Sequence, residues 1–566
     1  MIAMKLRILV IFCALLACSA VPLSMQGPSA GPEAIYYNGK VVTVDASSAV
    51  AAAFAVTDGR FVAVGTSDQM RALAGKRTTL VDLHGRTVVP GLIDNHNHQY
   101  HVALLTLRGV DLQNVTSLSA LLSRVREAAA GLPAGKTLFT TTGWSADRFP
   151  EKRGPSRSEL DQISDNRAIV VYESRGRVYV NSPALKALGA SRDTAVVARV
   201  NVGKDANGEP DGVLSGSPAA VLNLTARIVP APDLDEMKSI LTRIQVRQHA
   251  MGLTGIRDLQ LSRDVMRAYF ELWREGTLTL RTSVGLEVNA GEEVHLEALL
   301  NGWGVGVGFG DEWLRIDCIA EYNPGEQLRE PYVDRPGAEV GELRLPVDSF
   351  KQAILTINRA GWRPAIHISG DKTLDIVLDA YAAADRERSI RNRRWVVEHI
   401  PLVHPDQMKR MKELGVVVSA QFQPYGSGTE MIKRFGRGRA ERAVPMRELL
   451  DAGLVVSGGS DWPGAPNNPF VNIYYYVTRN TREAGPLGVA QKISRQEALR
   501  VMTLNNAFIT FEERIKGSIE AGKLADFVVL SDDLLTVPEQ RILEITAIAT
   551  YVGGKQVFAS SAFPGN

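Results

Sequence analysis

The sequence has little cysteine and no long run of like charges. Only three cysteines occur in 566 residues, and two of them, Cys13 and Cys18, lie close to the N-terminus. Cys318 is therefore alone in the body of the chain, so no internal disulfide can stabilise it. Lysine and arginine (64) nearly balance aspartate and glutamate (62). This balance argues against a nucleic-acid partner or an anionic membrane surface and favours a small-molecule ligand.

The overall composition is that of a globular protein. Apolar residues make up 45% of the chain and charged residues 22%, which excludes a disordered or collagen-like chain. The chain is longer than one ordinary domain, but a barrel with added segments can accommodate this length around one large core.

The N-terminus has the pattern of an export signal. Met4, Lys5 and Arg7 precede the apolar run from Ile8 to Ala17, which is too short to cross a bilayer and has the length of a signal-peptide core. Residues 15–18, Leu-Leu-Ala-Cys, resemble a bacterial lipobox, and cleavage after Ala20 or Ala30 is the alternative. We therefore expect residues 1–30 to be a signal peptide and linker. The chain would be exported to a bacterial periplasm or held at the membrane as a lipoprotein, with a lipid anchor at Cys18.

Both ends of the remaining chain contain β patterns. Ala34 to Val44 and Ala53 to Val64 are rich in Val, Phe and Tyr, and Asp58-Gly59 is a hairpin signal. Similar segments near the C-terminus are Ala525 to Leu530, Ala547 to Val552 and Lys555 to Phe558. We predict a composite β-sandwich domain made of residues 31–88 and 516–566. The alternative is two unrelated β pieces.

The middle of the chain alternates apolar strands with helical stretches, the pattern of a parallel sheet wrapped by helices. The fold class predicted is α/β, a (β/α)8 TIM barrel over residues 89–515. Its eight strands would be Val88 to Asp94, Gly255 to Leu259, Thr282 to Leu286, Leu314 to Glu321, Arg363 to Ile368, Trp395 to His399, Val416 to Gln421 and Leu454 to Ser460. Further strands at Thr137 to Thr142 and Ala168 to Glu173 would overfill the barrel, so residues of about 105–235 are predicted to be an insertion after the first barrel strand, on the catalytic face.

Four of these strands end in residues that bind metals. In a parallel barrel the carboxyl ends of the strands converge on one mouth. His96 and His98 follow the first strand two residues apart, so both can face the mouth. The other strand-end residues are His367, His399 and Asp461. A lone strand-end histidine is usually a satisfied polar residue, and Asp461 alone could cap a helix. However, four of only nine histidines fall at these ends, and imidazole with carboxylate suits a divalent ion such as zinc.

The same residues carry a resemblance to a known family. Pro90 to His98 resembles the Pro-Gly-(Leu/Phe)-Ile-Asp-x-His-x-His signature of the amidohydrolase superfamily, and the likeness extends from about residue 35 to the C-terminus. The chain is most similar to amidohydrolase family 3, the group that contains N-substituted formamide deformylase. The matching motifs are Thr142-Gly143-Trp144, Val180-Asn181-Ser182, His367 to Asp371, Glu398-His399, Gly459 to Pro463 and Gly517 to Asp526. The resemblance implies that His96, His98, His367 and His399 bind metal and that Asp461 is both a ligand and the catalytic acid/base.

The chain departs from this family in two places. Many members have a lysine near the end of the fourth strand that becomes carboxylated and bridges two metals, and here Ala320 stands at about that position with Glu321 next to it. Glu321 could supply the bridging carboxylate itself, or the site could hold a single ion. Where relatives often have Gly-His before Val-Asn-Ser, this chain has Arg175-Gly176-Arg177, which puts the usual substrate contacts in doubt.

These observations predict an exported metal-dependent hydrolase that cleaves a non-peptide C–N bond by attack of a metal-activated water. Arg175 and Arg177 could pair with a substrate carboxylate or be a solvated surface pair. Trp144, Tyr425 and Trp462 could form aromatic walls or pack ordinarily. Alternatives are an esterase, carbamate or thiocarbamate hydrolase, or an exported binding protein that has lost catalysis. We expect one or two ions, a small-molecule substrate, no nucleic acid and no transmembrane helix in the mature chain. A homodimer is left open.

Overall fold

The fold is described from a computed structural model of the chain. It describes residues 31–563, apart from short gaps at 114, 134, 174–175, 198–199, 217, 289–294, 336 and 463–466. The predicted signal peptide and Cys18 lie outside these residues. Among the helices that are described, none has both the length and the apolar character needed to cross a membrane.

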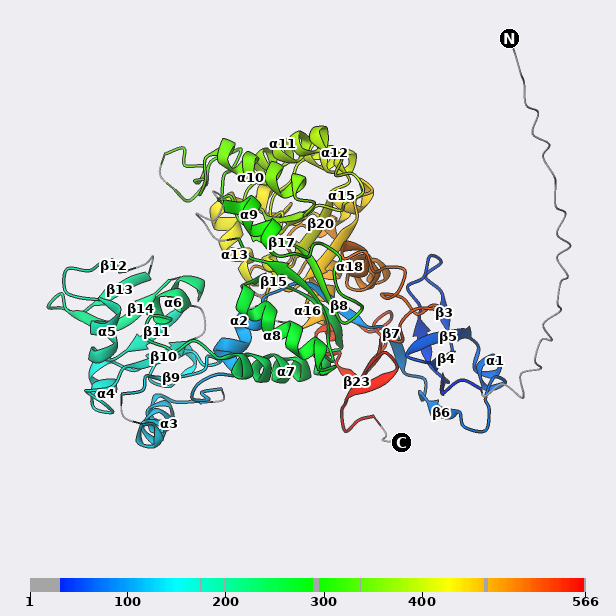
Figure 1. Ribbon diagram of the computed structural model, residues 1–566, viewed down its shortest axis with the longest axis horizontal. Coiled ribbons are helices and arrows are strands. Elements are labelled where there is room, and N and C mark those ends of the chain that lie inside the picture. The colour runs from blue at the N-terminus through cyan, green and yellow to red at the C-terminus, as the bar shows by residue number, and fades with distance from the viewer. Residues whose placement is uncertain are drawn as a thin grey trace, which may run out of the picture.

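Eight parallel strands form the central barrel (Figure 1). Their order is β21-β20-β19-β18-β17-β16-β15-β8, and each neighbouring pair is parallel. The ring closes between β21 and β8, where the Asp461 amide donates to the His96 carbonyl at 2.8 Å and Asn97 pairs with Trp462. The predicted TIM barrel is therefore confirmed. The strands are β8 (Leu92–Asn97), β15 (Leu253–Leu261), β16 (Arg281–Leu286), β17 (Leu314–Tyr322), β18 (Pro364–His367), β19 (Val396–Glu398), β20 (Val417–Gln421) and β21 (Val456–Gly459).

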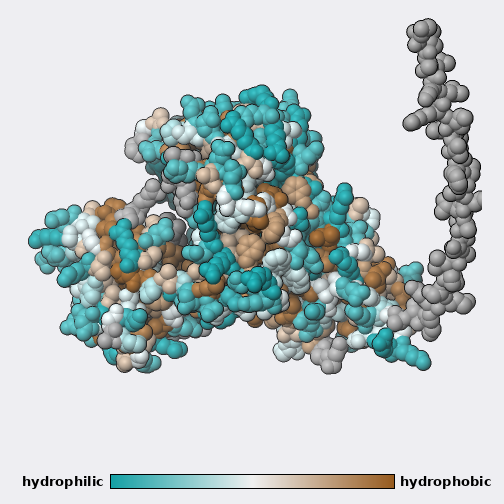
Figure 2. Space-filling view, in the orientation of Figure 1, coloured by the Kyte–Doolittle hydropathy of each residue, from teal (hydrophilic) through white to brown (hydrophobic). Residues whose placement is uncertain are grey.

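Amphipathic helices cover the barrel. In α11 (Asp371–Glu387) the buried residues Leu374, Val377, Leu378 and Tyr381 recur at the spacing of one helix face. The opposite face is polar, and Figure 2 shows a mostly hydrophilic surface over α11 and α12. The other helices of this part are α2 (Gln99–Thr106), α7 (Leu234–Ala250), α8 (Arg263–Arg274), α9 (Leu296–Gly302), α10 (Val347–Arg359), α12 (Pro405–Leu414), α13 (Gln423–Phe435), α14 (Arg437–Ala440), α15 (Met446–Asp451), α16 (Pro469–Thr478), α17 (Arg495–Val501) and α18 (Leu504–Ile509).

The first predicted barrel strand, Val88 to Asp94, is wrong in its bounds. The structure divides this segment into β7 (Thr87–Pro90), which pairs with strands of the terminal β-domain, and β8, which begins the barrel. Gly91 separates the two strands, and a Cβ at this position would clash with the Thr254 hydroxyl oxygen, so a larger residue would force the chain or Thr254 to move. Apolar residues on both sides of Pro90-Gly91 made the two strands look like one in the sequence.

The insertion folds as a separate lobe, drawn in cyan at the left of Figure 1. It has a six-stranded sheet with its own apolar clusters on both sides, separate from the barrel core. The predicted insertion after the first barrel strand is confirmed. Its elements are α3 (Leu118–Gly131), β9 (Leu138–Phe139), α4 (Arg157–Asp161), β10 (Ile169–Glu173), β11 (Arg177–Val180), α5 (Ser182–Leu188), β12 (Val196–Val197), β13 (Val200–Lys204), β14 (Pro210–Ser215) and α6 (Pro218–Thr225).

The two chain ends build one small β-domain, as predicted. Strands from both ends share a sheet of the order β24-β23-β22-β7-β2-β3, and a second sheet has the order β5-β4-β1-β6. Tyr36, Phe54, Phe61, Phe527 and Tyr551 pack together between them. Asp58-Gly59 forms the expected β4–β5 hairpin. The elements are β1 (Ala34–Tyr37), β2 (Lys40–Val42), β3 (Val50–Ala51), β4 (Ala53–Thr57), β5 (Arg60–Gly65), α1 (Ser67–Arg71), β6 (Thr79–Asp82), β22 (Phe527–Leu530), β23 (Ala547–Val552) and β24 (Lys555–Ala559).

A buried ion pair joins this domain to the barrel. Arg281, at the start of β16, donates from Nε and Nη2 to the two oxygens of Asp526 at 2.7 and 3.0 Å. The side chains are only 2% and 5% exposed. The Gly553 amide also donates to Asp526 Oδ1 at 2.8 Å. Removing either charge would leave the other buried without compensation.

We predict that Asp526→Ala lowers the free energy of unfolding by about 3–5 kcal/mol, because it strands the Arg281 guanidinium in the interior. Urea unfolding followed by circular dichroism measures this change. Glu387→Ala is the control, since it breaks an exposed pair with Arg359 that is expected to contribute less than about 1 kcal/mol. Similar losses in the two variants would contradict the role given to Asp526.

Candidate metal centre

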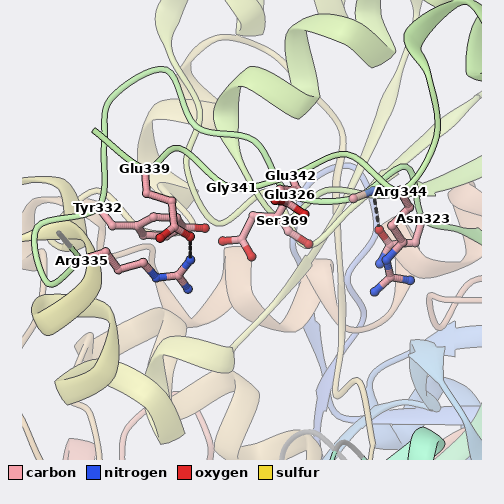
Figure 3. Close-up of a pocket in the computed structure, with 10 residues that line it drawn as sticks. Asn323, Glu326, Tyr332, Arg335, Glu339, Gly341, Glu342, Arg344 and Ser369 are labelled. Atoms are coloured by element: carbon pink, nitrogen blue, oxygen red, sulfur yellow. Dashed lines mark hydrogen bonds and ion pairs between the residues drawn. The ribbon is translucent and has the colours of Figure 1, made fainter. Parts of the chain in front are cut away.

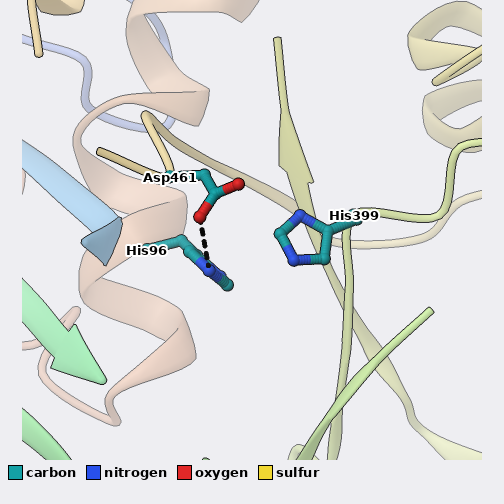
Figure 4. A group of neighbouring side chains, drawn as sticks. All are labelled: His96, His399 and Asp461. Atoms are coloured by element: carbon teal, nitrogen blue, oxygen red, sulfur yellow. Dashed lines mark ion pairs between the residues drawn. The ribbon is translucent and has the colours of Figure 1, made fainter. Parts of the chain in front are cut away.

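The barrel mouth brings together the residues that the sequence placed at strand ends. His96 lies in β8 and His98 directly follows it, with ring centres 5.2 Å apart. Their Nε2 atoms lie 3.4 and 3.3 Å from Oδ1 of Asp461, which follows β21. Figure 4 shows Asp461 pointing toward His96, with the His399 ring facing the same space. These three strand ends therefore face one point.

Glu321, near the end of β17, lies at the centre of this group. Its Oε1 lies 2.6 Å from His367 Nδ1 and 2.6 Å from His399 Nε2. On the other side, His96 Nε2 is 3.8 Å from Oε1 and His98 Nε2 is 3.9 Å from Oε2. One buried carboxylate thus touches both histidine pairs. All six residues predicted as ligands converge, although the ligand role itself stays a prediction.

The donor atoms fit a bound cation. Three overlapping groups each hold their ligand atoms within 4.8 Å of one another: His96 with His399 and Asp461, His96 with His98 and Glu321, and Glu321 with His367 and His399. Among the described residues, the buried Nε2 atom of His96 has no hydrogen-bond partner. A buried nitrogen lone pair without a partner, beside two carboxylates, is explained by an ion that the ring binds.

Both carboxylates of the centre are held in the ionised form. Burial alone would raise the pKa of Asp461, but the neighbouring imidazoles of His96, His98 and His399 outweigh it and lower that pKa. Burial is likewise outweighed at Glu321, whose pKa is held well below its usual value by His367 and His399. The two ionised carboxylates in turn outweigh the effect of burial on His96 and His98 and raise the pKa of both imidazoles. A bound cation would compensate the same carboxylates.

Two of the converging residues have left-handed backbone conformations. His399 has φ 70° and Asp461 has φ 53°, a region that non-glycine residues seldom adopt and that costs about 1–3 kcal/mol each. Backbone bonds at the strand ends fix them, from the His399 amide to the Ser419 carbonyl and from the Asp461 amide to the His96 carbonyl, both at 2.8 Å. These two backbone bonds thus hold the His399 and Asp461 side chains in orientations that a regular extended strand would not give them.

Partners outside the cluster orient the two histidines of β8. Glu398 Oε2 accepts from His96 Nδ1 at 2.7 Å, and the Leu259 carbonyl lies 3.4 Å from His98 Nδ1. Because each Nδ1 is occupied by an acceptor, each Nε2 presents its lone pair to the centre. Arg257 in turn donates to Glu398 Oε1 at 2.6 Å, and burial is outweighed by Arg257 and His96 so that the pKa of Glu398 falls to about 2.

Sequence reasoning missed the supporting residues. Glu398 appears in a matched motif without a role of its own, and Arg257 and Gln423 carry no motif. Gln423, the first residue of α13, donates to His399 Nδ1 at 2.8 Å and to Asp461 Oδ2 at 3.1 Å. A polar residue inside a barrel strand, as Arg257 is, was the one available signal.

The predicted substrate contacts are only partly near the centre. Trp144 is 2% exposed, stacks on Phe149 and donates to the Tyr172 carbonyl at 2.7 Å. It belongs to the core of the insertion and offers no surface to a substrate. Arg177 pairs with Glu173 of the same sheet at 3.4 Å. Arg175 lies outside the described residues.

Tyr425 and Trp462 follow β20 and β21, the strands that end beside the centre. Tyr425 is partly buried on α13, with its ring centre 6.1 Å from that of Phe422. Trp462 is partly buried against helical residues. A substrate role for either aromatic residue stays a prediction.

We predict that Glu398→Gln weakens metal binding about 10- to 100-fold, because the His96 ring loses a charged acceptor that orients it. Competition with a chromogenic chelator measures the affinity. Glu512→Gln is the matched control, since it removes a buried carboxylate paired with Lys516 outside the cluster. Equal weakening in both variants would mean a general loosening of the fold, and an unchanged affinity in Glu398→Gln would contradict the role proposed for that residue.

Comparison with known proteins shows similarity over nearly the whole chain. The model of a family described as "Amidohydrolase family" matches residues 79–558. The chain is 28% identical to the protein LONG AFTER FAR-RED 3 of Arabidopsis thaliana, over 92% of this chain and 91% of that protein. It is 28% identical to N-substituted formamide deformylase of Arthrobacter pascens, over 91% and 96%. The crystal structure of an uncharacterized metal-dependent hydrolase from Pyrococcus furiosus has a TM-score of 0.70 and 25% identity, covering 89% of this chain and all of that one.

Proposed function

Because the chain belongs to the amidohydrolase family and is a metal-dependent hydrolase, we propose that it hydrolyses a non-peptide carbon–nitrogen bond, an amide or an N-acyl group. The observation that carries this proposal is the convergence of four imidazoles and two ionised carboxylates at the barrel mouth. The relative named N-substituted formamide deformylase, similar over almost its full length, supports the choice of a C–N bond.

The ligand set favours zinc, because imidazole and carboxylate donors suit that borderline ion. Glu321 belongs to two of the three donor groups, one with His96 and His98 and one with His367 and His399. We therefore propose two ions that share Glu321, which takes the place of the carboxylated lysine. When bound, a divalent ion would lower the pKa of its water to about 7 and polarise the carbonyl oxygen of the substrate.

Asp461 moves the proton in the proposed reaction. Its side chain is 22% exposed, against 5% for Glu321, so of the two carboxylates it is the more accessible from the mouth. With a lowered pKa it is ionised at neutral pH and can accept a proton from the attacking water. The same carboxyl group then delivers that proton to the leaving nitrogen.

We also propose that the chain is exported, on the strength of the N-terminal pattern of Met4, Lys5, Arg7 and the apolar run after them. Mass spectrometry of the protein from its own cells tests this. An intact N-terminus in the mature protein would contradict cleavage, and an acylated Cys18 would identify a lipoprotein.

We predict that Asp461→Asn retains its metal but loses kcat by about 10²- to 10⁴-fold, because the proton acceptor is gone. Kinetics on paired anilide and ester substrates, with metal analysis of the same samples, measure this. Asp375→Asn is the control, since it changes a carboxylate that pairs with Arg329 outside the centre.

The same measurements separate the alternative functions. Faster turnover of esters or carbamates than of amides would favour those hydrolases. A wild-type protein that binds no metal, and stays inactive after zinc, manganese or cobalt is added, would overturn the enzyme proposal in favour of a binding protein.

A polar cavity of about 310 Å³ beside the centre supports a charged substrate. Figure 3 shows the side chains that surround it, from the loop after β17 and from Ser369. Asn323 and Ser369 lie two residues beyond Glu321 and His367, so the cavity begins within roughly 7 Å of them along the chain. Glu326 pairs with Arg434, and Arg335 pairs with Glu339.

Two charged side chains of this lining remain free to bind a ligand. Within the described part of the chain, Glu342 and Arg344 form no ion pair. We propose that Arg344 binds the carboxylate of an amino-acid-like amide, a role that the sequence had suggested for Arg175 and Arg177.

We predict that Arg344→Gln raises KM about fivefold for amides that carry a carboxylate and leaves neutral amides of the same shape unchanged, since an ion pair with the exposed Arg344 side chain would contribute up to about 1 kcal/mol. Steady-state kinetics on matched substrate pairs measures the difference. A rise in KM for the carboxylate substrates in Arg177→Gln but not in Arg344→Gln would contradict the role proposed for Arg344. It would instead support Arg177 as the residue that pairs with the carboxylate.

A further inference from the structure

The Gln423 side chain lies between two members of the centre that come from different strands. Its Nε2 atom is 2.8 Å from Nδ1 of His399, which follows β19, and 3.1 Å from Oδ2 of Asp461, which follows β21. An amide nitrogen carries two hydrogens, so it can donate to both acceptors at once. No other described side chain hydrogen-bonds to both of these residues.

The backbone around Gln423 is anchored on both sides. Phe422 is fully buried, and its carbonyl accepts from the Tyr425 amide at 2.8 Å. The Gln423 carbonyl accepts from the Ser427 hydroxyl at 2.8 Å, and the Tyr425 carbonyl accepts from the Arg482 amide at 2.7 Å. A side chain that starts from a fixed backbone reaches its two partners at little further cost in conformational entropy.

The bond to Asp461 determines how that carboxylate is turned. With Oδ2 held by Gln423, Oδ1 faces the Nε2 atoms of His96 and His98 at 3.4 and 3.3 Å. Asp461 lies beyond the last residue of β21, with φ 53°, so the regular strand does not set its side-chain direction. The bond from Gln423 therefore restricts rotation of the carboxylate about its terminal bond.

The bond to His399 bears on the tautomer of that ring. Nε2 of His399 faces Glu321 at 2.6 Å, and Nδ1 faces Gln423. An amide can present N–H or, after a half-turn, its carbonyl oxygen at the same place, so Gln423 can bond to either tautomer. A methionine of similar length can do neither, and a glutamate can only accept.

We propose that Gln423 is a positioning residue for the hydrolysis proposed above, on which this inference rests. It orients the Asp461 carboxylate and holds the His399 ring in place. It acts through these two residues and has no part in binding the ion.

The kinetic test compares Gln423→Met with Gln407→Met. In the first variant we expect unchanged metal content, KM within about threefold of wild type and kcat lowered about 10- to 100-fold, the size of effect that a small misplacement of a reacting group produces. Gln407 is the matched control, because its buried amide donates to the Asp371 carbonyl and to Asp375 outside the centre. A kcat within threefold of wild type in Gln423→Met, or a kcat that falls in proportion to metal content, would overturn the proposal.

A second readout needs no substrate. In the metal-free protein, the Gln423 amide contacts Nδ1 of His399, so the imidazole nitrogen resonances of His399 should report this contact. Gln423→Met and Gln423→Glu should shift these resonances, while Gln407→Met leaves them unchanged. Identical spectra in all four proteins would overturn the proposal. If no substrate is turned over at all, the proposed function fails, but the NMR comparison still tests Gln423.

Discussion

The burial of the Glu321 carboxylate among imidazoles is the constraint on which the rest of the site depends. A buried ionised group costs several kcal/mol unless it is paired and hydrogen-bonded, and Glu321 meets this cost through His367 and His399 at 2.6 Å. Asp461 adds a second ionised carboxylate beside the same ring of histidines. Four imidazoles cannot stay neutral and also balance two such charges, so the arrangement is best compensated by a divalent cation.

The interior of the barrel is adapted to this centre. TIM barrels are usually filled with branched aliphatic side chains, but here Arg257 connects Glu398, which holds His96, to Asp317 at 2.6 Å from each. Arg363 bonds to the far side of Asp317, and these side chains are at most 3% exposed. Apolar residues of similar volume would often be no less stable. Stability alone does not account for this row of buried charges. We attribute it to the orientation of His96.

The three parts of the molecule have different structural roles. The barrel strands supply rigid positions for the reactive side chains, and Arg281 with Asp526 fixes the terminal β-domain against the first half of the barrel. The insertion has its own apolar clusters, one containing Trp144 and the other Tyr172, and Trp144 donates to the Tyr172 carbonyl. We propose that selection of a substrate depends on the loops after the strands, among them the charged loop that carries Glu342 and Arg344.

The sequence by itself determined the barrel, the composite β-domain and the strand ends that hold His96, His98, His367, His399 and Asp461. Strand periodicity and hairpin chemistry are local, so they can be recognised without knowing any neighbour. Only the tertiary structure decided that Glu321 lies between both histidine pairs, that Gln423 spans His399 and Asp461, and that Trp144 is internal to the insertion. These facts concern contacts between elements that are far apart in the chain. The spacing of residues within one strand or helix does not show which side chains of another element will contact it.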